Sequence, residues 1–255
     1  MHALSLLAIS FGSPQWPLWI RSVLAVHITC GATGFVCAPV ALATAKGGKT
    51  HRRWGTVYFW AMAGVALTAM IMSIALPILF LALVAVFSFY SAFGAYRILY
   101  LKDLREGGKA KRIDWAAGVF TFVASLALGV LGVVRPMLVP VGLISLGHFR
   151  VSAVSVVFGF IGMRIAYVTM RGFWRPPREK MFWWYAHMQG MIGSYIAAWT
   201  AFSAVNLSHV FGAAWWVWLW PTMIGVPAII WWTRYYERKF SPRPKPPVAP
   251  VTSAA

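Results

Sequence analysis

The longest stretch without a charged side chain limits this sequence more than any other feature. Residues 54 to 96 contain no Asp, Glu, Lys or Arg. At about 1.5 Å per residue, a single helix of that length would be about twice as long as the roughly 30 Å hydrocarbon core of a bilayer is thick. The stretch therefore has to turn back, most simply near Pro77, and it predicts two membrane-crossing helices.

Residues 181 to 233 repeat this pattern, with the polar residues Asn206, Ser208 and His209 between two apolar halves. Only 11% of the residues are charged, against roughly 25% in soluble domains. The sequence therefore predicts an all-α, polytopic transmembrane helix bundle of about seven spans. These predicted spans are 18–43, 55–75, 78–99, 113–134, 141–168, 181–204 and 212–233.

The lysines and arginines gather between alternate spans. All but three of the 23 lie in four basic segments, at residues 46–53, 97–112, 164–180 and 234–245. Seven crossings place all four segments on one side and leave only Arg21, Arg135 and Arg150 toward the other. This positive-inside pattern predicts that the N-terminus lies outside and the basic C-terminus in the cytoplasm. Because the net charge of +18 then faces the cytoplasm and its anionic lipid headgroups, we expect the lipid bilayer as partner and no nucleic acid.

The two ends of the chain differ from the middle. Residues 1–17 contain an apolar run with no preceding Lys or Arg, so they predict an external or interfacial lead-in and no signal peptide. Residues 18–234 form the predicted bundle. Residues 235–255 are rich in proline and poor in apolar side chains, which predicts a flexible cytoplasmic tail.

Ionisable side chains inside spans are costly, so the histidines and arginines there are the first functional candidates. His27 precedes Lys46 by nineteen residues, and His148 precedes Arg164 by sixteen. Counted from the cytoplasmic ends, both histidines are therefore expected in the outer half of the bilayer at a similar depth. Arg150 lies near His148, and no carboxylate is expected close to it.

Small residues follow each of these two histidines on one helical face. Gly31 and Gly34 follow His27, whereas Ser152, Ser155 and Gly159 follow His148. Such faces are typical of helix–helix contacts in membranes. They are also what a flat cofactor needs. A sharper hypothesis places a b-type haem between the first and fifth spans, with His27 and His148 as axial ligands of the iron and Arg150 beside the propionates. The chain would then be an electron-transfer component or a membrane oxidoreductase.

A second group of candidates lies near the cytoplasmic side. His187 is expected about two turns inside the sixth span, and His51 at the headgroup boundary beside Arg52 and Arg53. A second cofactor between His187 and His51 would let electrons cross the membrane, but their unequal depths favour His51 as a membrane-surface residue. The grouping of His51 with Arg52 and Arg53 predicts a site for an anion or a lipid headgroup.

Three segments together resemble a known family. They are the first-span histidine His27, the GKTHRRWGTVY entry to the second span, and AHMQGMIGSYIAAWTAFSAVN in the sixth. The family consists of bacterial multi-pass membrane proteins and is catalogued only as a domain of unknown function. The resemblance covers roughly residues 22 to 205. It implies a cell inner-membrane protein with matching polar positions at His27, His51, Arg52 and His187, and it implies no activity.

Several kinds of chemistry are not indicated. The five acidic residues belong to cytoplasmic segments or span ends, and the sequence has no P-loop, dinucleotide glycine motif or Cys-x-x-Cys pair. Catalytic residues are therefore unknown, and two alternatives stand beside the haem hypothesis. One is a non-catalytic subunit or assembly factor of a larger membrane complex, which small-residue faces such as Ser125, Gly129 and Gly132 favour. The other is a carrier for lipids or anions, with Arg150 as the binding group.

Overall fold

The computed structural model describes residues 16–76, 79–138, 146–211 and 214–240. The described part of the chain is helical, which confirms the predicted all-α class. The helices of the bundle are α2 (Leu18–Ala43), α3 (Lys49–Ala75), α4 (Leu79–Arg97), α5 (Arg112–Leu138), α6 (Leu146–Trp174), α7 (Phe182–Asn206), the short α8 (Ser208–Phe211) and α9 (Trp215–Phe240). The predictions for residues 1–15, Pro77 and residues 241–255 lie outside the described residues.

Among the described residues, five helices are long and apolar enough to cross a membrane: α2, α3, α4, α5 and α6. This is the composition of an integral membrane protein. Helices α7 and α9 are 25 and 26 residues long and also lack charged side chains over residues 181–233. They are richer in tryptophan and tyrosine, the side chains that membrane proteins concentrate at the two membrane surfaces.

The helix ends follow the predicted breaks, but three helices extend beyond the predicted spans at the basic end: α3 begins at Lys49, α6 ends at Trp174 and α9 ends at Phe240. Helix α3 ends at Ala75 and α4 begins at Leu79, on either side of the predicted turn. Helix α9 continues to Phe240, so residues 235–240 of the predicted tail are helical. Aromatic packing explains this extension, because the Trp184 ring lies 4.4 Å from that of Tyr236 and 5.6 Å from that of Phe240.

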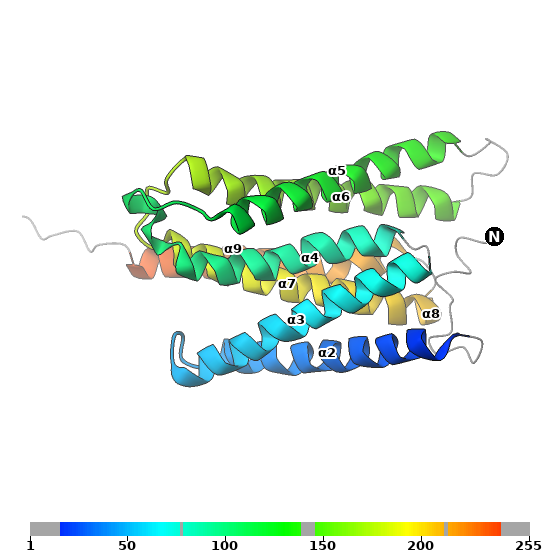
Figure 1. The fold of residues 1–255 in the computed structure, drawn as a ribbon, viewed down its shortest axis with the longest axis horizontal. Helices are drawn as coiled ribbons and strands as arrows, with labels where there is room; N and C mark the ends of the chain where they lie inside the picture. The colour runs from blue at the N-terminus through cyan, green and yellow to red at the C-terminus, as the bar shows by residue number, and fades with distance from the viewer. Residues whose placement is uncertain (1–15, 77–78, 139–145, 212–213, 241–255) are drawn as a thin grey trace, which may run out of the picture.

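The helices form three layers, which Figure 1 shows from the side. The α2–α3 hairpin lies on one side of the bundle, and the α5–α6 hairpin lies on the other. Between them lie α4, α7 and α9. Helix α4 contacts α3, α5, α6 and α7, and its Ala92 is completely buried, so the core of the bundle is built around α4.

Close backbone contacts hold α5 against α6. A Cβ added at Gly159 would lie 2.6 Å from the backbone nitrogen of Gly129, and one added at Gly132 would lie 2.7 Å from the carbonyl oxygen of Ser152. Only glycine allows helices to approach this closely. The small-residue faces that the sequence singled out on these two helices are therefore occupied by each other.

The basic segments gather at one end of the bundle. The α2–α3 turn, the segment between α4 and α5, the segment between α6 and α7, and the C-terminal end of α9 all lie there (Figure 1). One ion pair is built into this end. Asp114, at the start of α5, is only 2% exposed and accepts hydrogen bonds from Arg97 Nε at 2.6 Å, Arg97 Nη2 at 3.0 Å and the Lys111 backbone N–H at 2.9 Å.

Candidate functional site

The first predicted ligand, His27, is half-buried on α2 and bonds to α3. Its Nδ1 lies 2.9 Å from Oγ1 of Thr68. The Thr68 hydroxyl donates its own proton to the carbonyl oxygen of Gly64 at 2.6 Å, so Oγ1 accepts the hydrogen bond from the His27 Nδ1–H. The His27 ring also hydrogen-bonds to the backbone of Val65.

The structure does not bring His27 and the start of α6 together. Helix α6, which contains His148 and Arg150, packs against α5, α4 and α9, whereas α2 packs against α3 and α7. Figure 1 shows α2 and α6 on opposite sides of the bundle, with the central layer between them. The side chains of His148, Arg150 and His209 lie outside the described side chains. Equal depth along the sequence did not reveal this, because depth says nothing about which helices are neighbours.

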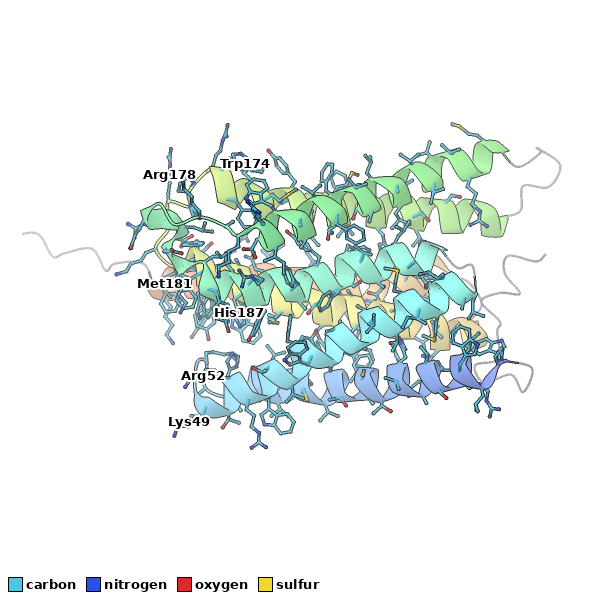
Figure 2. All side chains as sticks on the ribbon, viewed as in Figure 1. Lys49, Arg52, Trp174, Arg178, Met181 and His187 are labelled. Atoms are coloured by element: carbon cyan, nitrogen blue, oxygen red, sulfur yellow. The ribbon has the colours of Figure 1, made fainter. Side chains whose placement is uncertain are left out.

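Instead, the structure brings together the two histidines near the basic end, His51 and His187. Their ring centroids are 6.3 Å apart, and the ring planes are inclined by 77°. His51 lies in the first turn of α3, and His187 lies in the second turn of α7. Figure 2 shows His187 at the same end of the bundle as Lys49 and Arg52, which flank His51 in the sequence.

Both rings are held in the same way, by a hydrogen bond from Nδ1 to a backbone carbonyl. His51 Nδ1 lies 2.9 Å from the oxygen of Ala41, and His187 Nδ1 lies 2.8 Å from the oxygen of Ala95. A carbonyl oxygen can only accept, so each Nδ1 has to carry the proton and each Nε2 keeps its lone pair. The two carbonyls belong to the last turns of α2 and α4, where helices have no internal partners for them. Metal-ligating histidines are commonly oriented by this kind of bond.

The helices around the pair approach each other through small residues. A Cβ at Gly190 would lie 2.7 Å from Cβ of Ala95 and 2.9 Å from the carbonyl oxygen of Ser91. Because Gly190 lets α7 approach α4, His187 can reach Ala95. On α3, one turn beyond His51, a Cβ at Gly55 would have no neighbour within 4 Å, so the space beside this face is open.

Deeper in the bundle, a buried hydrogen bond joins the same two helices. Tyr58 Oη of α3 lies 2.7 Å from Ser194 Oγ of α7. Ser194 in turn donates to the carbonyl oxygen of Met191, so the Tyr58 hydroxyl is the donor. Tyr58 is 3% exposed, and Ser194 is fully buried. This bond lies about two turns beyond both histidines, where it fixes α3 relative to α7.

The geometry of the pair can be compared with that of two imidazoles bound to one metal ion. A metal–nitrogen bond is about 2.0–2.1 Å long, and the ligating nitrogen lies about 1.1 Å from the centre of its ring. Two imidazoles on opposite sides of one metal ion therefore have ring centroids about 6.3 Å apart. The observed centroid distance is 6.3 Å, with the two rings in an edge-to-face arrangement. Within the described ranges, no group of three or more His, Cys, Asp or Glu side chains could hold a metal ion. Two histidines suffice for haem iron, because the porphyrin supplies the other four ligands.

The basic side chains near the pair have two different environments. Arg52 and Arg53 are exposed on the first turn of α3. Lys46, in the α2–α3 turn, instead donates to the carbonyl oxygens of Ala41, at 3.4 Å, and Leu42, and so closes the end of α2. Burial lowers the pKa of the Lys46 ammonium from its ordinary value. Arg52 and Arg53 are therefore exposed cations that can meet an anionic group beside the histidine pair.

Comparison with known proteins adds no assignment. No family model, no curated protein and no solved structure matches the chain. The resemblance to a bacterial family of unknown function therefore stays a prediction. The function has to be argued from the paired histidines.

Proposed function

We propose that this chain is an electron-transfer protein of a bacterial inner membrane. In this proposal, His51 of α3 and His187 of α7 would hold one b-type haem. The observation that carries the proposal is the pairing itself: two imidazoles with a ring-centroid distance of 6.3 Å, each fixed through Nδ1 so that Nε2 is the ligating nitrogen. When bound, the haem supplies one-electron redox chemistry.

The surroundings of the pair suit this group. Gly55 leaves open space one turn from His51. Trp54 and Met191, each within about a turn of one histidine in the sequence, pack against the apolar cluster that contains Tyr58. An apolar environment favours a flat, largely hydrophobic macrocycle. Arg52 and Arg53 provide exposed cations at the same end, where the propionates of a haem need charge partners.

The proposal replaces the earlier pair of ligands with a new one. Helices α2 and α6 lie on opposite sides of the bundle, which favours His51 and His187 over His27 and His148 as the ligands. The subunit and carrier hypotheses have no comparable support. The small residues of α5, on which the subunit hypothesis rests, pack against α6 of the same chain. The carrier hypothesis rests on Arg150, whose side chain is not among those that the structure describes.

The reduced-minus-oxidised visible spectrum of the purified full-length chain tests the haem. We expect a b-type spectrum for the wild type and its loss in His51→Ala and in His187→Ala. His27→Ala is the matched control, because it removes another half-buried histidine whose Nδ1 is hydrogen-bonded. It should keep the spectrum. A colourless preparation from haem-replete cells would refute the proposal, as would a spectrum that persists in both His51→Ala and His187→Ala.

His187→Ala also removes the hydrogen bond to the Ala95 carbonyl, and loss of that bond alone could abolish haem binding. A variant that removes the hydrogen bond but keeps an iron ligand distinguishes this effect from loss of the ligand. Methionine binds haem iron but cannot donate to the Ala95 carbonyl. His187→Met should therefore keep the haem, with a changed spectrum and a higher midpoint potential. If His187→Met had the same visible spectrum and midpoint potential as the wild type, His187 would not be a ligand.

The proposal also includes the topology: seven crossings by α2 to α7 and α9, with the basic end in the cytoplasm. It rests on the gathering of the basic segments at one end of the bundle (Figure 1). A topology reporter inserted after Glu106 should give a cytoplasmic signal, and one inserted after Asn206 should give an external signal. A cytoplasmic signal at Asn206 would contradict the seven-span arrangement and would leave the haem test unaffected.

A further inference from the structure

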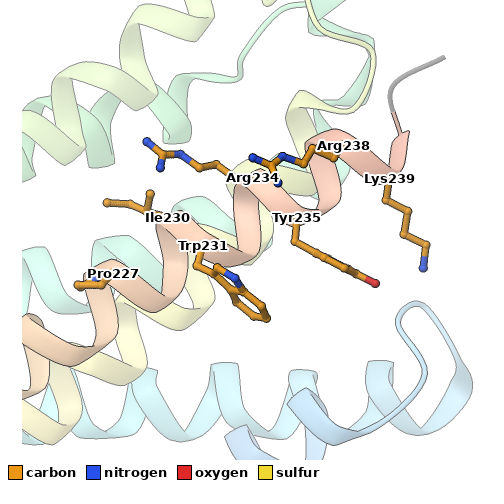
Figure 3. A pocket seen from close by; sticks show the side chains of 7 residues that line it. All are labelled: Pro227, Ile230, Trp231, Arg234, Tyr235, Arg238 and Lys239. Atoms are coloured by element: carbon orange, nitrogen blue, oxygen red, sulfur yellow. The ribbon is translucent and has the colours of Figure 1, made fainter. Parts of the chain in front are cut away.

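Helix α9 carries a groove on its exposed face that the haem proposal does not use. The groove has a volume of about 950 Å³. Its lining residues recur at helical spacing along a single face and are drawn in Figure 3: Pro227, Ile230, Trp231, Arg234, Tyr235, Arg238 and Lys239. All of them are exposed, so no other part of the described chain covers the groove.

Two rows of side chains, each with a spacing of four residues, form the walls of the groove. One row is Ile230, Arg234 and Arg238, and the other is Pro227, Trp231, Tyr235 and Lys239. Figure 3 shows the Arg234 and Arg238 guanidinium groups on one side of the helix and the Trp231 and Tyr235 rings on the other. The two rings are stacked, with centroids 6.1 Å apart and planes inclined by 23°.

The chemistry changes along the groove. Pro227, Ile230 and Trp231 line its inner part, and Arg234 and Arg238 follow toward the C-terminal end of the helix. Figure 3 shows the two guanidinium groups on one side of the helix and the Lys239 ammonium on the other. No carboxylate lines the groove; Glu237 lies on the adjoining face of α9 and is not among the lining residues. The groove therefore combines apolar side chains with two arginines, in that order along the helix.

We infer that this groove binds one anionic phospholipid. The Arg234 and Arg238 guanidinium groups bind the phosphate. An acyl chain lies along Pro227, Ile230 and Trp231. Arginine pairs with phosphate oxygens in a bidentate way, and basic side chains at the cytoplasmic surface attract anionic lipids. A soluble anion would use the cations but would leave the apolar part of the groove in contact with other lipids. The site depends on α9 crossing the membrane and is independent of the haem.

Lipid titration of the detergent-purified full-length chain, followed by native mass spectrometry, tests the inference. The probes are phosphatidylglycerol, phosphatidylcholine with matched acyl chains, and glycerol phosphate as the headgroup without a chain. We expect preferential retention of one phosphatidylglycerol. Arg234→Gln with Arg238→Gln should weaken this retention about tenfold or more, because each basic side chain near an anionic membrane surface contributes about 1 kcal/mol. Trp231→Ala, which leaves the charges intact, should weaken binding of both lipids.

The matched control removes two exposed arginines from the same end of the bundle, Arg175 and Arg178 in the segment between α6 and α7. Arg175→Gln with Arg178→Gln should keep the wild-type preference. Equal losses in the two double variants would overturn the inference in favour of a diffuse basic surface. Wild-type retention by the groove variant would also overturn it. Glycerol phosphate binding as tightly as phosphatidylglycerol would show a simple anion site. The haem spectrum should be unchanged in every variant, so this test fails or succeeds separately from the proposed function.

Discussion

Substituting Gly159 by alanine should weaken the contact between α5 and α6 more than a glycine-to-alanine substitution at any other position of this hairpin. The added Cβ would lie 2.6 Å from the backbone nitrogen and 2.7 Å from the Cα of Gly129, and 2.8 Å from the carbonyl oxygen of Ser125. All three are backbone atoms, so no side-chain rotation can relieve the overlap. The helices would have to separate by about 0.8 Å to restore an ordinary 3.4 Å contact.

The magnitude follows from two opposing effects. Overpacking a tight contact costs about 1–3 kcal/mol, and backbone atoms place this site toward the upper part of that range. Alanine in place of glycine favours the helix by up to about 1 kcal/mol. The expected net change is a loss of about 1–2 kcal/mol in the free energy of unfolding.

Gly172, in the last turn of the same helix, provides the control, because a Cβ there meets nothing within 4 Å. Gly172→Ala should leave stability unchanged or raise it by up to about 1 kcal/mol. Gly162→Ala should fall between the two, since its closest neighbour is the Ser125 side chain, which can rotate. The assay is unfolding in mixed detergent micelles with increasing dodecyl sulfate, followed by circular dichroism. If Gly159→Ala proved as stable as Gly172→Ala, the close approach of α5 and α6 would be refuted.

Three further substitutions test contacts that hold the ends and the core, in the same unfolding assay. Arg97→Gln should lower the free energy of unfolding by about 3 kcal/mol, because it leaves the buried Asp114 carboxylate without its cation; an unchanged stability would contradict the ion pair. Tyr58→Phe should cost about 1–2 kcal/mol, since the buried Ser194 oxygen loses its only donor among the described residues. Lys46→Met should cost about 1 kcal/mol, because the Leu42 carbonyl at the end of α2 loses its donor while His51 still donates to Ala41.

The positions of the helices could be predicted from the sequence because charge and hydropathy act locally. A charge-free stretch cannot remain in water, and Lys and Arg mark where it leaves the membrane. Helix α2 accordingly has the predicted bounds, 18 and 43. Where the end of a helix depends on packing, the prediction was less accurate. Helix α9 extends to Phe240 because Trp184, on another helix, provides the rings that its last turns contact.

The site could be predicted only in part. The sequence identified His27, His51 and His187 as unusual, but it paired residues by depth, and depth does not say how helices are arranged around the bundle. The neighbours of α7 are set by Gly190, which lets α7 approach α4 closely enough for His187 to reach the Ala95 carbonyl. The two rings meet although His51 is the third residue of α3 and His187 the sixth of α7. Both facts are properties of tertiary packing, which a single sequence records only indirectly.

The layered arrangement has a consequence for biosynthesis. The central layer combines α4 with helices that are made much later, and His187 follows His51 by 136 residues. At about 5–20 residues per second, a ribosome needs roughly 7–27 s to travel that distance. During this interval the α5–α6 hairpin is synthesised, but the Ala95 carbonyl does not yet have its hydrogen bond from His187. The paired imidazoles therefore come into being only when the sixth long helix inserts beside α4. Any group they hold has to be delivered after most of the protein is in the membrane.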